Sequence, residues 1–113
     1  MPMFKPGTIV LVNFPFTDLQ SSKVRPALVI TKKGDDVNIP GIFSKSIDKL
    51  RESWIKVDGL SLDFHQTGLK KTPIIKTEKI TVIHQSLVRK ELGYLSSELM
   101  QQVKKILRKT LEI

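Results

Sequence analysis

The sequence predicts a small α+β domain that is mainly β, in which a barrel-like sheet of short strands packs against one C-terminal amphipathic helix. Short β-branched and apolar runs recur between residues 8 and 83. Clusters of Gly, Pro, Asp and Ser separate these runs, as turns do. Only the chain from Ser96 onward has apolar residues at helical spacing. A doubly wound α/β fold, in which helices alternate with strands, is therefore not expected.

The first two expected strands enclose a long connection. Residues 8–14 are apolar or β-branched on both alternating faces, as in a buried strand, and residues 26–31 form a second such run. Two short neighbouring strands favour a hairpin. The connection from Pro15 to Arg25 is longer than the usual hairpin loop of about two to five residues. Long ordered loops often carry function, although a plain surface loop is the alternative.

The middle of the chain predicts further strands. A turn is expected over residues 32–36, which include Gly34 and two aspartates. Pro40 and Gly41 interrupt the next run and predict either an edge strand or a bulge there. The runs with strand character are residues 37–43, 53–57, 73–76 and 79–83.

The C-terminal segment predicts the helix. Ser96 is suited to cap its N-terminus, and Glu98 lies in the first turn, where the helix dipole favours an acid. Basic residues gather in the last turns, where cations are favoured. The face expected to pack on the sheet carries Leu99, Val103, Ile106, Leu107 and Thr110.

Composition limits the class of protein. A chain of 113 residues fits a single domain, here residues 1–113, and 40% hydrophobic residues suffice for a core. Without cysteine there is neither a disulfide nor thiolate chemistry. No apolar run reaches the roughly 20 residues of a membrane span, and the first residues lack a signal sequence, so we expect a cytoplasmic protein. The net charge of +8 favours a polyanion such as nucleic acid, with a solubilising basic surface as the alternative.

Metal and cofactor sites are not expected. Neither His65 nor His84 has a cysteine or a second histidine at ligand spacing, and the adjacent Asp35 and Asp36 point in different directions in a turn. Glycines are too scattered for a phosphate-binding loop. Both histidines are expected at exposed strand ends, in structural or surface roles rather than in acid–base catalysis.

Arg25 is the strongest candidate for a functional residue. The following Pro26 disfavours helical geometry at Arg25 and suits the first position of a strand. A guanidinium just before the start of a rigid strand presents a fork of hydrogen-bond donors, which suits a phosphate. The alternative, equally open from the residues alone, is an arginine that caps the sheet or pairs with Asp18.

The motifs and their order resemble MazF/PemK-family toxins over nearly the whole chain. The specific part is KPGTIVLVNFPFTD at residues 5–18, followed by KVRPALVI at residues 23–30. Weaker matches are TGLKKTP at residues 67–73 and LSSEL at residues 95–99. The resemblance implies an SH3-like β-barrel with a C-terminal helix, which usually forms a homodimer. It also implies a sequence-selective endoribonuclease that uses no metal or cofactor and is neutralised by a small acidic antitoxin.

The resemblance implies roles for particular residues. Arg25 matches the family's catalytic arginine, and residues 15–24 match the loop beside its active site. The family's second catalytic position is a threonine or serine, but Phe43 aligns with it here and Ser44 follows one place later. A bulge at residues 40–41 can turn Ser44 toward the site, and we predict it as the second catalytic residue. Further contacts to single-stranded RNA are expected from Asp18, Ser22, Lys23, Lys45 and Ser46.

Two other functions stay open. CcdB-like toxins share this barrel, but they poison DNA gyrase and cleave no RNA. A catalytically impaired, RNA-binding member of the family is the second alternative. The Arg25-Pro26 pair and its long loop disfavour a gyrase poison, whereas Phe43 at the hydroxyl position gives each alternative some support.

Overall fold

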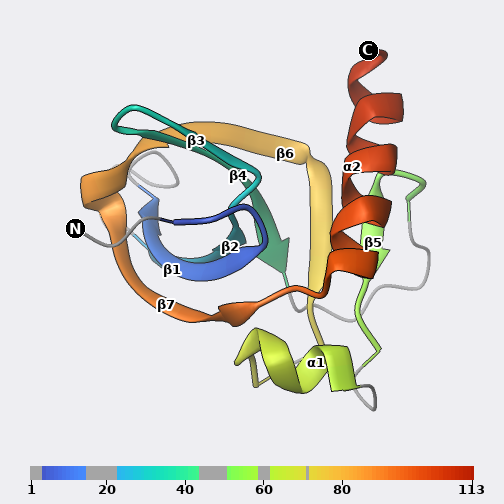
Figure 1. Cartoon of the computed structure of the whole chain (residues 1–113), viewed down its shortest axis with the longest axis horizontal. Coiled ribbons are helices and arrows are strands. Elements are labelled where there is room, and N and C mark those ends of the chain that lie inside the picture. Colours follow the sequence, from blue (N-terminus) through green and yellow to red (C-terminus); the bar gives the residue numbers. More distant parts are fainter. Residues whose placement is uncertain (1–3, 15–22, 44–50, 59–61, 71) are drawn as a thin grey trace.

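The computed structural model describes residues 4–14, 23–43, 51–58, 62–70 and 72–113. The elements follow one another in the order shown in Figure 1. They are β1 (Thr8–Phe14), β2 (Lys23–Leu28), β3 (Thr31–Lys33), β4 (Asp36–Phe43), β5 (Trp54–Lys56), α1 (Leu62–Thr67), β6 (Ile74–His84), the 3-10 turn η1 (Gln85–Leu87), β7 (Val88–Tyr94) and α2 (Ser97–Leu111).

The strands form one curled antiparallel sheet. Its order is β5-β6-β4-β2-β1-β7, and the short β3 pairs with β4. Figure 1 shows β1, β2, β4, β6 and β7 curling around a common interior, with α2 standing beside β6 and α1 near the end of β7. The predicted mainly-β fold with a C-terminal helix is confirmed. The sheet is open rather than closed into a barrel, because β5 and β7 are the two ends of the hydrogen-bonded order in the described residues.

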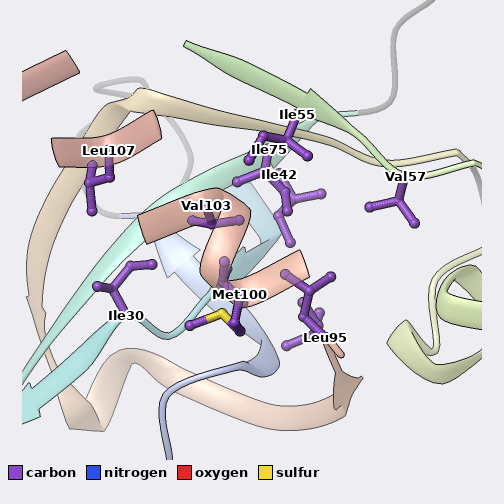
Figure 2. Close-up of a cluster of buried hydrophobic side chains, with 11 residues drawn as sticks. Ile30, Ile42, Ile55, Val57, Ile75, Leu95, Met100, Val103 and Leu107 are labelled. Carbon is purple, nitrogen blue, oxygen red and sulfur yellow. The ribbon is translucent and has the colours of Figure 1, made fainter. Parts of the chain in front are cut away.

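One face of the sheet packs against α2. Strand residues and α2 residues interdigitate there in a group that we call the helix-side cluster, and Figure 2 shows Met100, Val103 and Leu107 of α2 projecting into it. Each side chain removed from water in this way contributes about 1.5–3 kcal/mol. The buried members are Ile9, Leu28, Ile30, Ile42, Ile55, Val57, Ile75, Leu95, Met100, Val103 and Leu107.

The side chains on the other face of the sheet pack against one another inside the curl. Because neighbouring residues of a strand point to opposite faces, Ala27 lies in this second group while Leu28 lies in the first. We call the second group the strand-side cluster. Its buried members are Phe4, Val10, Val12, Ala27, Val29, Val37, Ile39 and Ile83.

The bulge predicted at residues 40–41 is present, but its extra residues lie in the partner strand. Pro40 pairs with Ile80, and the next residue, Gly41, pairs with Lys76, so residues 77–79 of β6 have no partner in β4. Proline has no N–H to donate to a ladder, which accounts for the interruption. β4 lies between β2 and β6, so the alternative of an edge strand is wrong.

Several predicted elements have different bounds. The runs at residues 73–76 and 79–83 form the single strand β6, which is bent at the bulge. The run at residues 26–31 divides between β2 and β3. β2 begins at Lys23, so Pro26 lies inside the strand rather than at its first position. Neither α1 nor β7 was predicted.

The C-terminal helix and its cap agree with the prediction, but its packing face does so only in part, because Met100 is buried and was not predicted, whereas Leu99, Ile106 and Thr110 are half-buried. Ser96 caps α2, and its Oγ accepts a hydrogen bond from the backbone N–H of Leu99 at 3.2 Å. Met100, Val103 and Leu107 form the buried face. Neither helix in the described ranges is long and apolar enough to cross a bilayer.

Close packing of α1 against β7 generates a test of the fold. A Cβ atom added at Gly93 would lie 2.2 Å from the carbonyl oxygen of Gln66 and 2.5 Å from that of Thr67. Gly93→Ala is therefore expected to lower the free energy of unfolding by at least about 2 kcal/mol, measured by urea denaturation.

Gly34 provides the matched control for this substitution. Its φ is +59°, but an added Cβ would meet nothing within 4 Å. Gly34→Ala should cost only about 1 kcal/mol, from the left-handed backbone alone. Equal losses in the two variants would contradict the close packing of α1 on β7.

Candidate functional site

Arg25 lies on the strand-side face of the sheet, where β2 runs between β1 and β4. It pairs with Val12 of β1, and because Ala27 pairs with Gly41, Arg25 lies across from Phe43 of β4. The extended backbone expected from the Arg25-Pro26 step is confirmed by its place within β2. Its side chain is half-buried, beyond the end of the strand-side cluster.

The guanidinium of Arg25 combines an aromatic contact with an unsatisfied donor. Its Cζ lies 5.6 Å from the centroid of the Phe43 ring. Its Nε is buried and has no hydrogen-bond partner among the described residues. A buried donor left without an acceptor costs about 1–3 kcal/mol, so such donors are rare outside sites that receive an acceptor from a ligand or water. Arg25 therefore has a buried donor that no acceptor among the described residues satisfies.

Arg25 is the first member of a longer series of charges and rings. The Nζ of Lys76 lies 4.2 Å from the centroid of the Phe43 ring and 4.4 Å from that of the Trp54 ring. The Cζ of Arg51 lies 5.4 Å from the same Trp54 ring. We call these five side chains, Arg25, Phe43, Lys76, Trp54 and Arg51, the cation–ring row.

The sheet register explains the row. Trp54 pairs directly with Lys76, and Lys76 pairs with Gly41, two residues from Phe43 on the same face of β4. The neighbours Ile55, Ile75 and Ile42 point the other way, into the helix-side cluster. Four adjacent strands, β2, β4, β6 and β5, therefore contribute a cation, a ring, a cation and a ring in that order.

A carboxylate secures the far end of the row. Glu78 accepts hydrogen bonds from the Ser53 hydroxyl and from the indole N–H of Trp54. Partial burial raises the pKa of Glu78, but the two hydrogen bonds and the charge of Arg51 outweigh it, and the pKa falls below its ordinary value of 4.5. Glu78 is thus a charged acceptor near neutral pH that holds the Trp54 ring in place.

Phe43 faces the site, as the alignment with the family suggests. On β4, Ile39 belongs to the strand-side cluster and Ile42 to the helix-side cluster, so alternation places Phe43 on the face of Arg25. The extra residues of the bulge lie in β6, so the bulge does not shift this alternation within β4. The prediction for Ser44 needed an extra residue within β4, and β4 has none as far as Phe43, the last residue described there.

The other predicted site residues lie largely outside the described part of the chain. The backbone of Lys23 pairs with that of Phe14 at the start of β2. The expected alternative pairing of Arg25 with Asp18 is untested, because Asp18 is not among the described residues. Outside the described residues are Asp18, Ser22, Ser44, Lys45 and Ser46.

Neither histidine is a member of the cation–ring row. The Nδ1 of His84 accepts a hydrogen bond from the backbone N–H of Ser86 at 3.1 Å, which caps η1 at the end of β6 as a strand-end role requires. His65 is exposed, but it lies in α1, so its predicted strand-end position is wrong.

Four residues of the site, Lys76, Trp54, Arg51 and Glu78, were not predicted from the sequence. One local signal was available. Alternation in residues 53–57 places Trp54 and the apolar Ile55 on opposite faces of the strand, so that Trp54 lies on the face away from the core. Pairing between residues 54 and 76 is long-range, and no local pattern specifies it. The row could therefore be found only from the sheet register.

The carboxylate of Glu78 generates a pH prediction. A carboxyl group with a lowered pKa contributes stability above its ordinary pKa and loses it as the pH falls through the lowered value. The emission of Trp54, the single tryptophan, should stay constant from about pH 7 to about pH 5 and change below 4.5. Glu78→Gln should remove this transition. A midpoint above 4.5 in the wild type would contradict the hydrogen-bonded arrangement.

Solved structures resemble this fold closely. An endoribonuclease in complex with its cognate antitoxin, from a mycobacterial species, aligns with a TM-score of 0.75 at 14% identity, covering 100% of this chain and 97% of that one. The Mycobacterium tuberculosis toxin MazF-mt6 aligns with a TM-score of 0.72 at 15% identity, covering 96% and 98%. A chain of the MazE–MazF complex from Deinococcus radiodurans aligns with a TM-score of 0.75 at 14% identity, covering 99% of each.

Sequence comparison identifies the family. No curated protein matches the chain significantly. The family model for PemK-like, MazF-like toxins of type II toxin–antitoxin systems matches residues 5–111. This match spans nearly the whole chain and includes every described element. The chain therefore belongs to the family of PemK-like, MazF-like toxins of type II toxin–antitoxin systems.

Proposed function

We propose that this toxin is a metal-independent, sequence-selective endoribonuclease that cleaves single-stranded RNA at Arg25. The observation that carries the proposal is the half-buried guanidinium whose Nε has no acceptor among the described residues. A phosphate oxygen is an acceptor of suitable charge for it. Two similar structures are described as endoribonucleases, which supports the same activity for this chain.

The proposed reaction uses the RNA's own 2′-hydroxyl as the nucleophile. Its oxygen gives up its proton to water and attacks the adjacent phosphorus, the bond to the 5′-oxygen breaks, and that oxygen takes up a proton from water. The products carry a 2′,3′-cyclic phosphate and a 5′-hydroxyl. Negative charge grows on the phosphoryl oxygens during this step. Donors already aimed at such charge contribute roughly 3–4 kcal/mol each. An arginine stays charged and has no acceptor, so Arg25 acts by charge stabilisation rather than by proton transfer.

Ser44 is proposed as the second catalytic residue, orienting the scissile phosphate through its hydroxyl. The support is its position one residue after Phe43, which aligns with the family's hydroxyl residue. Further RNA contacts are proposed for Asp18, Ser22, Lys23, Lys45 and Ser46.

Phe43 favours a second candidate function, a toxin that binds RNA without turnover. A phenyl ring on the face of Arg25 supplies no hydroxyl. Such a protein would bind RNA in a salt-sensitive manner and generate no new RNA ends. A gyrase-directed toxin would likewise leave RNA intact, but it would damage DNA in cells.

We also propose the partners that the family suggests. An acidic antitoxin fits a chain of net charge +8, and the mycobacterial and Deinococcus structures include complexes with antitoxins. Such partners are often disordered and fold on binding. A homodimer and a cytoplasmic location complete the proposal.

The central test removes the guanidinium. Purified toxin should cleave single-stranded RNA in EDTA, and Arg25→Ala should lower the rate by at least about 10²-fold. Arg25→Lys should remain impaired, because an ammonium lacks the planar fork. The readout is the appearance of 5′-hydroxyl ends by RNA sequencing, with thermal denaturation to verify folding.

Arg108→Ala removes one positive charge from the exposed side of α2 and serves as the control. It should cleave as the wild type does. A requirement for a divalent cation, or cleavage that survives loss of Arg25, would rule out the proposed mechanism.

A separate test concerns Ser44. Ser44→Ala is expected to lower kcat by about 10²-fold while leaving the affinity for uncleavable RNA nearly unchanged, because the hydroxyl acts on the reacting phosphate. Ser97→Ala, at an exposed position on α2, is the control. An unchanged kcat in Ser44→Ala would remove Ser44 from the catalytic group and leave Arg25 to be judged by its own variants.

A further inference from the structure

The cation–ring row extends well beyond Arg25, and its outer members are not needed for cleavage chemistry at one phosphate. β4 separates β2 from β6, so two strand spacings, about 10 Å, separate the backbones that carry Arg25 and Lys76. Arg51 lies farther along the same direction, beside the Trp54 ring on β5. Cations spaced along a line suit successive charges of a chain.

We infer that Lys76 and Arg51 bind backbone phosphates of the RNA beside the scissile phosphate, so that the substrate strand crosses the sheet from β2 toward β5. This inference rests on the proposed function, since it takes Arg25 as the point of cleavage. It assigns a binding role to two residues that lie outside the motifs shared with the family. It also fixes the direction in which the substrate leaves the site.

In this arrangement the main effect of the aromatic rings is to hold the cationic side chains in place. Lys76 lies over both the Phe43 and the Trp54 ring, so each ring of the row has two cations near it. A cation over a ring is stabilised by about 0.5–2 kcal/mol. Long basic side chains lose up to about 2 kcal/mol of rotamer entropy when they bind a ligand. Rings that already hold these side chains reduce that loss.

Glu78 strengthens this arrangement without blocking it. Both of its oxygens accept hydrogen bonds, one from Ser53 and one from the Trp54 indole. The carboxylate is thereby committed to fixing the ring over which Lys76 and Arg51 lie. With three cations and one carboxylate, the row keeps a positive balance that attracts a polyanion.

The test measures the salt dependence of RNA binding. The probe is a fluorescein-labelled RNA of about 12 nucleotides, of mixed sequence, with 2′-O-methyl groups throughout so that it cannot be cleaved. Its affinity is followed by anisotropy from about 50 to about 300 mM NaCl. For each phosphate that a variant no longer neutralises, the slope of log K against log salt should fall by about 0.7 for a single strand.

Lys76→Met and Arg51→Met should each show that reduction, and Lys76→Arg should restore the wild-type slope. Lys104→Met removes one positive charge from exposed α2, which packs on the opposite face of the sheet, and should leave the slope unchanged. Binding of the probe should also change the emission of the single tryptophan, Trp54, in the wild type. Thermal denaturation verifies that each variant is folded.

The outcomes separate this inference from the proposed function. Wild-type slopes in both Met variants, or a probe that does not bind the wild type, would overturn the RNA path. Cleavage that persists together with unchanged slopes would discard the path and keep the nuclease. Reduced slopes in a protein that makes no cuts would support the path and reject the nuclease.

Discussion

The antiparallel register of β4 with β6 determines which side of the sheet carries each residue of the candidate site. Ile42 pairs with Ile75, which in turn pairs with Ile55, and all three are buried in the helix-side cluster. A shift of the register by one residue would expose these side chains and bury Phe43 and Lys76 instead. It would therefore lose about 1.5–3 kcal/mol of stability for each apolar side chain exposed. The same apolar contacts that hold α2 on the sheet therefore present the cations on the other face.

Two prolines limit how closely β2 and β4 pair beside Arg25. Pro26 and Pro40 both lack the N–H that a ladder requires. In the described residues, β2 and β4 pair only through Ala27 and Gly41. Arg25 thus lies where the ladder between these strands ends, held on the other side by its pairing with Val12 of β1. The backbone that carries the guanidinium is therefore paired on the side of β1, and its ladder toward β4 ends next to it.

Local patterns predicted most of the elements, whereas the site depends on pairings between distant residues. The run at residues 8–14, the cap at Ser96 and the interruption at Pro40 were all visible in the sequence, because each follows from neighbouring residues. β7 escaped prediction because its outward residues are charged and no buried alternation marks it. Arg25 could be singled out as a candidate from Pro26, and the family resemblance then favoured a functional role over a structural one. Its neighbour Lys76 could not, because 51 positions separate them and only the sheet register joins them.

Phe43 changes what the site can contribute to catalysis. A hydroxyl at this position would donate one hydrogen bond, whereas the phenyl ring donates none and lies instead against Arg25 and Lys76. An apolar ring beside a guanidinium displaces water, and interactions of a charge are stronger where water is displaced. An interaction worth about 1 kcal/mol in water rises to about 4 kcal/mol at an effective dielectric of 20. The ring thus takes away one directed hydrogen bond, while its apolar surface favours stronger interactions of the cations that it contacts. A site arranged in this way presents charge rather than a hydroxyl, and its buried donor without a partner among the described residues is the Nε of Arg25.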